Sequence, residues 1–173
     1  MDDPIQAALQ RDHPDAVELL WDRYARDLLA FLQAVLCSRH DAEDVLQTVF
    51  IRIVRQRRRL AEARCLDAYV YQIARNEAAR FLRRRGRKRE DEAGAEPWLV
   101  AAEADSAPGE LAEQLQAALA QLPPAQREVV VLKIYRDKTF QEIAAILELS
   151  QNTAASRYRY ALEKLRVLLR DDS

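Results

Sequence analysis

The stretch TFQEIAAILELSQNTAASRYRYALEKLRVLL, residues 139–169, carries the clearest structural signals in the chain. It opens with Thr139 and, three residues later, Glu142, which is the spacing of a capping box. In such a box the hydroxyl and the carboxylate each bond an unpaired backbone amide at the start of a helix. Ser150 supplies a second capping side chain. The stretch therefore predicts a helix over 139–147, a turn over 148–150 and a second helix over 151–169, together a helix-turn-helix.

The second predicted helix has an apolar and a polar face. Its apolar side comprises Ala154, Tyr158, Ala161, Leu162, Leu165 and Leu169. Its outward side comprises Asn152, Ala155, Ser156 and Arg159, with Gln151, Arg157 and Tyr160 at the flanks. Asn and Arg side chains pair with adenine and guanine edges in the major groove, and Ser and Gln at a helix N-terminus hold phosphates. This face predicts DNA binding, and the alternative is a solvated face of a surface helix.

The composition favours helix throughout the chain. The 173 residues are 49% hydrophobic and 32% charged and include only three glycines. We predict an all-α protein made of two small helical domains. The longest apolar runs, such as residues 28–32, are too short to span a bilayer, and the acidic start is unlike a signal peptide. Both features predict a cytoplasmic protein without membrane insertion.

Charge is segregated along the chain although the net charge is only -1. Residues 39–90 hold fifteen Lys or Arg against seven Asp or Glu, whereas residues 90–126 hold no basic residue. The acidic segment 90–109 also carries two of the three glycines and two of the six prolines, which is typical of a linker. We therefore expect domains at 1–89 and 110–173 joined by a linker at 90–109. Its apolar cluster 98–100 can dock on a partner or anchor the linker loosely.

Three amphipathic helices are expected before the linker. The first follows Pro14, with Asp15 as its cap, and carries an apolar stripe from Val17 through Trp21 to Val35. The second begins at Asp41 as N-cap and buries Ala42, Val45, Leu46, Val49, Phe50, Ile53 and Val54. The third runs from about 66 to 85, ends near Gly86, and buries Val70, Ile73, Ala74, Phe81 and either Glu77 or Ala78.

Two further helices are expected after the linker. Apolar residues at 111, 115, 118, 119 and 122 form a short amphipathic helix that Pro123 and Pro124 stop. Pro124 suits the first turn of the next helix, which runs to about Tyr135. The run Val129–Val131 in that helix has strand character, but no partner strand is visible in the sequence.

The helix that begins at Asp41 has a stripe opposite its core face, formed by Asp44, Gln47, Thr48, Ile51 and Arg55. An exposed isoleucine within an acidic stripe indicates a protein partner, although spacing alone favours a capped helix with an incidental Ile. A metal-dependent hydrolase using Asp41, Glu43 and Asp44 is a third interpretation. No histidine or second carboxylate cluster accompanies them, and the cysteines and histidines lack zinc spacing, so we expect no metal or cofactor.

The third helix interleaves aromatic and basic residues: Tyr69, Tyr71, Arg75, Asn76 and Arg80, followed by the basic run 83–89. Aromatic rings stack on unpaired bases and guanidinium groups follow phosphates. The helix therefore predicts binding to opened DNA, and a solvated basic helix end is the plainer alternative.

Four sequence motifs together indicate membership of a known protein family: DAEDVLQ at 41–47 with FIR at 50–52, YVYQIARN at 69–76, LPP at 122–124 and FQEIA at 140–144. Over almost the whole chain, from about Asp15 to Leu169, the sequence resembles the extracytoplasmic-function sigma factors of the sigma-70 family. The resemblance implies a non-enzymatic protein that binds core RNA polymerase and promoter DNA and takes no small-molecule substrate. An anti-sigma factor is a further candidate partner. The alternative is a helix-turn-helix repressor or activator that binds duplex operator alone.

The resemblance also implies which residues make each contact. The β′ clamp of the polymerase would contact Asp41, Glu43, Asp44, Gln47, Phe50 and Ile51, and the β flap would contact the second domain. The minus-ten element would be melted and read by Tyr69, Tyr71, Arg75, Asn76, Arg80 and Arg83. The minus-thirty-five element would be read by Gln151, Asn152, Ala155, Ser156, Arg157, Arg159 and Tyr160.

The chain departs from the family pattern at several of these positions. Glu148 occupies the turn position where the family usually has glycine, at a cost of about 1 kcal/mol of backbone strain. Asn152, Ala155 and Tyr160 replace the usual Gly, basic residue and Arg, which predicts a changed minus-thirty-five preference. Thr48 replaces a frequent acid on the stripe that faces the polymerase.

Overall fold

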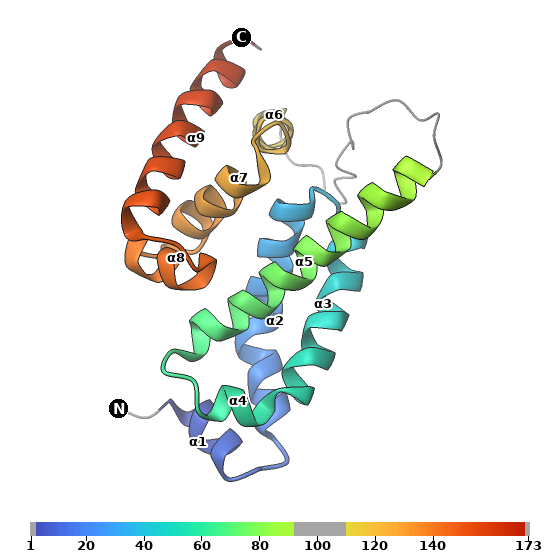
Figure 1. Ribbon diagram of the computed structural model, residues 1–173, viewed down its shortest axis with the longest axis vertical. Helices are drawn as coiled ribbons and strands as arrows, with labels where there is room; N and C mark the ends of the chain where they lie inside the picture. Colours follow the sequence, from blue (N-terminus) through green and yellow to red (C-terminus); the bar gives the residue numbers. More distant parts are fainter. Residues whose placement is uncertain (1–2, 92–109, 172–173) are drawn as a thin grey trace.

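The structure is a computed structural model that describes residues 3–91 and 110–171 (Figure 1). All regular secondary structure within these two ranges is helical, which confirms the predicted all-α class. The Trp98 cluster of the predicted linker lies outside the described residues. None of the helices in the described part is long and apolar enough to cross a bilayer.

The first half of the chain forms five helices: α1 (Pro4–Gln10), α2 (Ala16–Leu36), α3 (Arg39–Arg55), α4 (Arg57–Ala61) and α5 (Leu66–Asp91). Helices α2, α3 and α5 are the three expected from the sequence, whereas α1 and α4 were not predicted. Both are at most seven residues long, too short for a helical repeat to show in the sequence. Asp3 caps α1, since its carboxylate accepts a 3.0 Å hydrogen bond from the Ile5 amide.

The predicted apolar stripes form the core between α2, α3 and α5. Phe31 on α2, Val49 on α3 and Val70 on α5 are all fully buried. Both candidates for the buried position on α5, Glu77 and Ala78, are buried. Two stripe positions are exposed, Trp21 at 48% and Val54 at 37%, and Phe81, which was also expected to be buried, is only half-buried. Each lies at the margin of its stripe, where spacing alone does not separate a buried side chain from a half-covered one.

Three predicted helix ends differ in the structure. Ser38, not Asp41, caps α3, and its Oγ accepts a hydrogen bond from the Asp41 amide at 3.3 Å. Asp15 precedes α2 without a capping hydrogen bond from its side chain. Helix α5 continues through Gly86 to Asp91. A single Gly costs a helix only about 1 kcal/mol, and the flanking Arg, Lys and Glu residues are good helix formers.

The second half of the chain forms α6 (Glu110–Ala120), α7 (Pro124–Val130), the π-helical turn η1 (Val131–Tyr135), α8 (Phe140–Leu147) and α9 (Gln151–Asp171). Pro124 stands in the first turn of α7, as predicted, and the valine run 129–131 is helical. The capping box is present in full: Thr139 Oγ1 accepts from the Glu142 amide, and the Glu142 carboxylate accepts from the Thr139 amide at 2.7 Å. The predicted helix-turn-helix is therefore formed by α8 and α9.

The turn between α8 and α9 has a left-handed residue at the predicted position. Glu148 has φ 54° and ψ 48°, the conformation that glycine adopts without steric cost. Ser150 then caps α9, since its Oγ accepts from the Thr153 amide at 3.1 Å. The left-handed turn is therefore formed even though the Cβ of Glu148 makes this conformation sterically costly.

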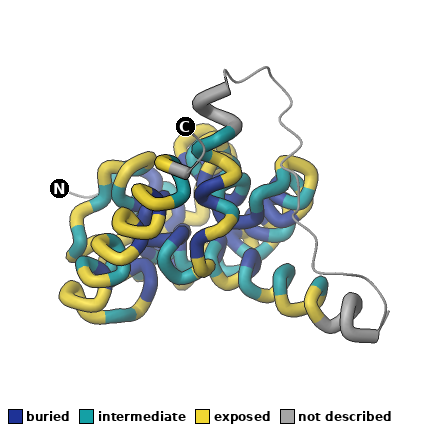
Figure 2. The backbone as a smooth tube through the Cα atoms, turned by 90° about the horizontal axis from the view of Figure 1, so that it is seen from above, coloured by how far each residue is buried: buried dark blue, intermediate teal, exposed yellow. Residues whose placement is uncertain are grey.

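The two halves of the chain pack against each other. Helix α8 lies beside α5, and α7 and η1 lie beside α2 (Figure 1). One cluster of buried apolar residues runs from α1–α5 into the second half, where it includes Val131, Ile143 and Leu147. Buried segments accordingly lie where helices meet, and exposed segments lie outside them (Figure 2). Sequence reasoning did not foresee this arrangement.

We expect Glu148→Gly to stabilise the protein by about 0.5–1 kcal/mol, because glycine adopts φ 54° without the steric cost that Glu148 bears. Urea denaturation followed by circular dichroism measures the change. Glu148→Ala is the matched control, since it removes the same side chain but keeps a Cβ, and it should bring no gain. Equal stabilisation by Ala would locate the effect in the side chain instead.

Candidate nucleic-acid and protein interfaces

The predicted minus-thirty-five residues all lie on the first three turns of α9. Gln151, Asn152, Ser156, Arg159 and Tyr160 are exposed, and the Arg159 guanidinium lies 5.0 Å from the centre of the Tyr160 ring. The opposite side of the helix is fixed by Ala154 and Ala161, both fully buried. Their small side chains allow α9 to lie close to α7 and α8.

Three residues of α9 differ from the expected division into two faces. Leu162 was placed on the apolar side but is 39% exposed. Ala155 and Arg157 are half-buried. Burial raises the pKa of the Glu128 carboxyl, and the charge of Arg157 is close enough to counter part of this rise. Arg157 thus faces the body of the molecule more than the remaining polar residues of α9 do.

The predicted minus-ten residues divide between two sides of α5. Tyr69, Asn76 and Arg80 recur at helical spacing and share one side, and Arg83 extends it. Tyr69, Asn76 and Arg80 line a pocket of about 160 Å³, which is completed by Arg52, Gln56, Gln72, Ile73 and Glu77. The Tyr69 hydroxyl donates to Gln56 Oε1 at 3.2 Å. This side of α5 is open to solvent and rich in hydrogen-bonding groups.

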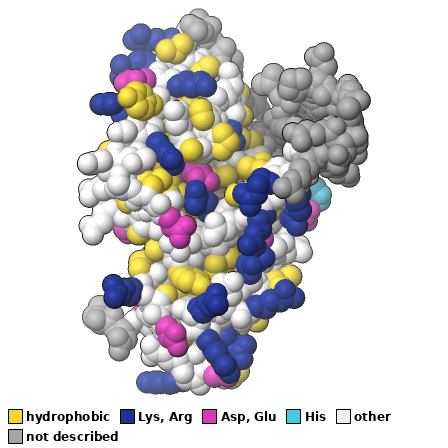
Figure 3. All heavy atoms as spheres, viewed as in Figure 1, with side chains coloured by type: hydrophobic (Ala, Val, Ile, Leu, Met, Phe, Trp, Pro, Cys, Tyr) yellow, Lys and Arg dark blue, Asp and Glu magenta, His cyan; other side chains and the backbone are white. Residues whose placement is uncertain are grey.

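A buried carboxylate fixes the guanidinium groups around this pocket. Glu77 is 4% exposed and forms ion pairs with Arg52 of α3 and, at 2.9 Å, with Arg80 of α5. The two arginines keep much of their surface exposed. Figure 3 shows basic side chains gathered over α5 and the neighbouring α3 on this face of the molecule.

Tyr71 and Arg75 lie on the other side of α5 and face the second half of the chain. Tyr71 is 3% exposed, and its ring meets Phe31 edge-on at 5.5 Å. Burial raises the pKa of Tyr71 to about 12. Arg75 pairs with Glu128 of α7, with 3.3 Å between Nε and Oε2. These two predicted DNA contacts are therefore not on the open surface in this arrangement.

The outward stripe of α3 is exposed as expected, with Ile51 at 54% and Asp44 and Gln47 also exposed. Phe50 is 7% exposed and lies beneath Trp21, with 4.5 Å between the ring centres. Phe50 supports this surface rather than forming it. Trp21 is an exposed aromatic residue that sequence reasoning had assigned to the core. In the sequence, only the large size of Trp21 and its place at the edge of the apolar stripe pointed to this exposure.

The three carboxylates considered as metal ligands each face a basic side chain instead. Asp41 is paired with Arg85 of α5, and Glu43 with Arg39 at 3.0 Å. The Asp44 carboxylate lies 3.8 Å from the His40 ring nitrogen. Ion pairs with arginine therefore account for Asp41 and Glu43, whereas Asp44 lies at the surface beside His40.

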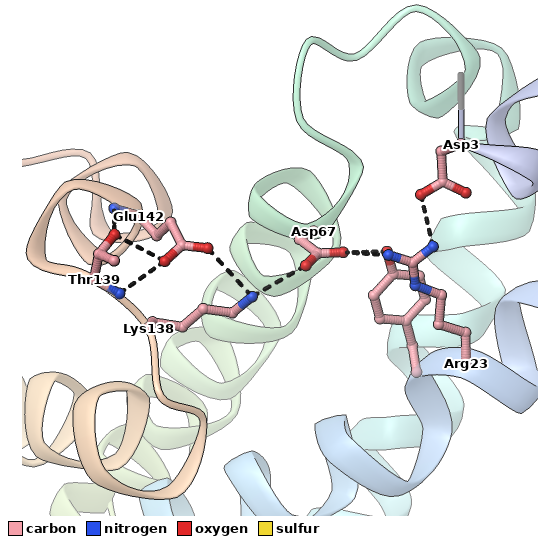
Figure 4. Close-up of polar contacts among 7 residues, drawn as sticks. Asp3, Arg23, Asp67, Lys138, Thr139 and Glu142 are labelled. Carbon is pink, nitrogen blue, oxygen red and sulfur yellow. Dashed lines mark hydrogen bonds and ion pairs between the residues drawn. The ribbon is translucent and has the colours of Figure 1, made fainter. Parts of the chain in front are cut away.

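A chain of polar contacts connects the capping box of α8 to the start of α1 (Figure 4). Lys138 Nζ lies 3.7 Å from the Glu142 carboxylate and 3.0 Å from that of Asp67 in the first turn of α5. Arg23 of α2 contacts Asp67 at 3.3 Å and Asp3 at 2.6 Å. The buried Tyr24 hydroxyl also donates to Asp67, at 2.5 Å. Asp67 thus holds groups from both halves of the chain.

The surroundings of Asp67 favour its charged form. Burial by itself would raise the pKa of Asp67, but the hydrogen bonds from Tyr24 and Lys138 and the charges of Lys138 and Arg23 outweigh it and lower the pKa. A group with a lowered pKa in the folded state contributes stability above its ordinary pKa, 3.8 here, and loses it as the pH falls through the folded-state value.

Asp67→Asn should therefore cost about 1 kcal/mol of unfolding free energy near neutral pH and progressively less in acid. Urea denaturation at about pH 7 and at about pH 3 would measure the gap between wild type and variant. The exposed Glu163 on α9 offers a control, since Glu163→Gln should leave both values unchanged. A difference in unfolding free energy between wild type and variant that grows on acidification would contradict the lowered pKa of Asp67.

Comparison with known proteins gives this helical architecture a family. The family described as Sigma-70 region 2 matches residues 20–88, and Sigma-70, region 4 matches residues 118–167. The RNA polymerase sigma factor CarQ of Myxococcus xanthus is 35% identical over 159 residues, 90% of either chain. The ECF RNA polymerase sigma factor RpoE of Cereibacter sphaeroides is 31% identical over 90% of this chain and 88% of its own. The chain belongs to the extracytoplasmic-function sigma factors of the sigma-70 family.

Solved structures agree with the fold. The sigma factor RpoE of Bartonella quintana, in complex with the anti-sigma factor NepR, superposes with a TM-score of 0.79 over 92% of this chain and 99% of its own, at 24% identity. CnrH in complex with the cytosolic domain of CnrY gives a TM-score of 0.74 at 23% identity, over 98% of this chain and 97% of its own.

Proposed function

We propose that this chain binds core RNA polymerase in the cytoplasm and directs transcription initiation at specific promoters, without catalysing a reaction itself. The observation that carries the proposal is the exposed polar face of α9, in a chain that matches both sigma-70 regions over most of its length. The relatives named above are RNA polymerase sigma factors. The unlike surfaces on α3, α5 and α9 would give polymerase and DNA separate binding sites.

Region 4 would read the minus-thirty-five element with α9 in the major groove. Asn152 and Arg159 are exposed and carry the groups that pair with adenine and guanine edges. Gln151 begins α9, where phosphate oxygens are bound, and Ser156 lies in the second turn with an exposed side chain. Arg157 is half-buried and would contribute less to base reading than Arg159.

Region 2 would hold opened minus-ten DNA along the pocket side of α5. Tyr69 offers a ring for stacking on an unpaired base, and Asn76 offers an amide for its edge. Arg80 and the exposed Arg83 would follow the phosphates of the same strand. The 160 Å³ pocket between α3 and α5 is the natural place for a base that has left the duplex stack.

The α3 surface would bind the β′ clamp of the polymerase. Ile51 offers an exposed apolar side chain, and Asp44 and Gln47 surround it with polar groups. Trp21 of α2 extends the apolar area and is the kind of residue that anchors protein interfaces. The β flap would bind region 4, and an anti-sigma factor is a further candidate partner, as for the sigma factor RpoE that was solved with NepR.

Run-off transcription tests the proposal. Purified bacterial core polymerase is combined with a library of random promoter-sized duplexes, with and without this protein. Specific starts that appear only with the protein would support the sigma-factor function and reveal its promoter. Tight, sequence-specific duplex binding by the isolated protein, with no specific starts, would overturn it in favour of a repressor or activator.

Arg159→Ala should weaken discrimination at one base pair of the upstream element by about 1–3 kcal/mol, because a guanidinium pairs bidentately with guanine. Run-off yields from promoters varied at single positions would measure it. Arg166→Ala is the control, since Arg166 is exposed farther along α9. Equal losses on every promoter variant would make Arg159 a phosphate contact.

Asp44→Arg should weaken assembly with core polymerase about tenfold, because it reverses a charge in the proposed clamp surface. The side chain is 59% exposed and lies 3.8 Å from the His40 ring at the surface, so the fold should persist. Competition with a labelled wild-type protein for core polymerase measures assembly, with Glu163→Arg on α9 as the charge-matched control. Unchanged competition by the Asp44 variant would exclude this surface as the clamp contact.

A further inference from the structure

Four polar contacts join region 2 to region 4 across their interface. Arg136 Nη1 lies 2.5 Å from Asp27 Oδ1 of α2, and Lys138 Nζ lies 3.0 Å from Asp67 of α5. Arg75 of α5 pairs with Glu128 at 3.3 Å. The Gln72 amide donates to the Ala145 carbonyl at 2.7 Å. In each of the three ion pairs, the two charges come from different regions.

A buried guanidinium adds a fifth connection. Arg127 of α7 is 9% exposed and donates to the carbonyls of Leu119, Ala120 and Leu122 in its own half of the chain. Its Nη1 also donates to the Val35 carbonyl at 2.8 Å and to Cys37 Sγ at 3.0 Å, both at the end of α2. Arg127 therefore bonds both regions at once.

The closed arrangement keeps the two DNA-reading surfaces close together. Gln72 and Ala145 are hydrogen-bonded, Asn76 is one helical turn beyond Gln72, and Asn152 is seven residues beyond Ala145. Even with the latter segment fully extended, Asn76 and Asn152 lie within about 40 Å of each other. Promoter elements named minus-ten and minus-thirty-five are about 25 base pairs apart, or about 85 Å of duplex at 3.4 Å per pair. The closed arrangement cannot occupy both.

We propose that these contacts form an intramolecular latch that holds the free protein closed, and that Tyr71 and Arg75 are latch residues of α5 rather than DNA readers. The proposal rests on the proposed function, which supplies the two separated promoter elements. Polymerase can use the protein only after the latch opens. Because only open molecules bind, the apparent affinity for core polymerase equals the affinity of the open form multiplied by the fraction of molecules that are open.

The chemistry of the interface suits a latch that can open. The Asp27 side chain is 50% exposed and that of Asp67 32%, so water weakens both ion pairs even though Arg136 and Lys138 are mostly buried. Val131, Ile143 and Leu147 of region 4 also join the buried apolar cluster of region 2, so opening exposes apolar surface as well as breaking the ion pairs. Tyr71, buried at this interface, would gain a solvated hydroxyl on opening.

Charge reversal of the Asp27–Arg136 pair tests the latch. Asp27→Arg and Arg136→Asp each place like charges opposite one another, and the double variant restores an ion pair. The single variants change the net charge in opposite directions. A non-specific electrostatic effect on DNA or polymerase would therefore raise the half-saturating protein concentration in one variant and lower it in the other. If the latch exists, both single variants should shift this concentration in the same direction, and the double variant should behave like the wild type.

Two measurements are made on the full chain. Small-angle X-ray scattering gives the radius of gyration, which should increase in both single variants and not in the double. Run-off titration with core polymerase gives the half-saturating protein concentration, which should fall about three- to tenfold in both singles. Asp27→Asn, which only removes a charge from a half-exposed side chain, serves if a reversal does not fold, and should show a smaller shift of the same sign.

The outcomes separate the latch from the proposed function. Unchanged scattering in both singles would overturn the latch, as would expansion without a fall in half-saturation. Opposite shifts in the two singles would replace it with non-specific electrostatics. An absence of specific starts with every variant would sink the sigma-factor function, while the scattering still reports whether the latch exists.

Discussion

Helix α5 is the element on which the arrangement of the molecule depends, because three of its sides have different surroundings. One side carries Val70, Ala74 and Ala78 into the core with α2 and α3. A second carries Tyr69, Asn76 and Arg80 along an open pocket, and a third carries Tyr71 and Arg75 against region 4. Moving any of these residues by one position would turn its side chain by about 100° and exchange one environment for another.

Sequence reasoning succeeded where a local rule determines the structure. The capping box of Thr139 and Glu142, the cap at Ser150 and the left-handed position of Glu148 are set by residues within a few positions of one another. The division of α9 into two faces follows from helical spacing for the same reason. Leu162 is the exception, because it lies at the margin of the apolar side, whose centre is held by the buried Ala161 and Leu165.

The rest required contacts between residues far apart in the chain. Nothing local to Tyr71 or Arg75 distinguishes them from Tyr69 and Arg80, since all four are aromatic or basic residues of one helix. Their surroundings differ because Glu128, Arg136 and Lys138, more than fifty residues later, meet only one side of α5. The site residues predicted from the family resemblance remain predictions, now divided into those at an open surface and those at an interface.

The contact between Arg127 and Cys37 has a chemical consequence. Cys37 is half-buried, and burial raises the pKa of its thiol although Arg127 partly offsets this, so little reactive thiolate is present in the closed protein. The second thiol of the chain, Cys65, is exposed at the start of α5. Alkylation of Cys37 by a small electrophile should therefore be slower than that of Cys65 while α2 and α7 stay in contact.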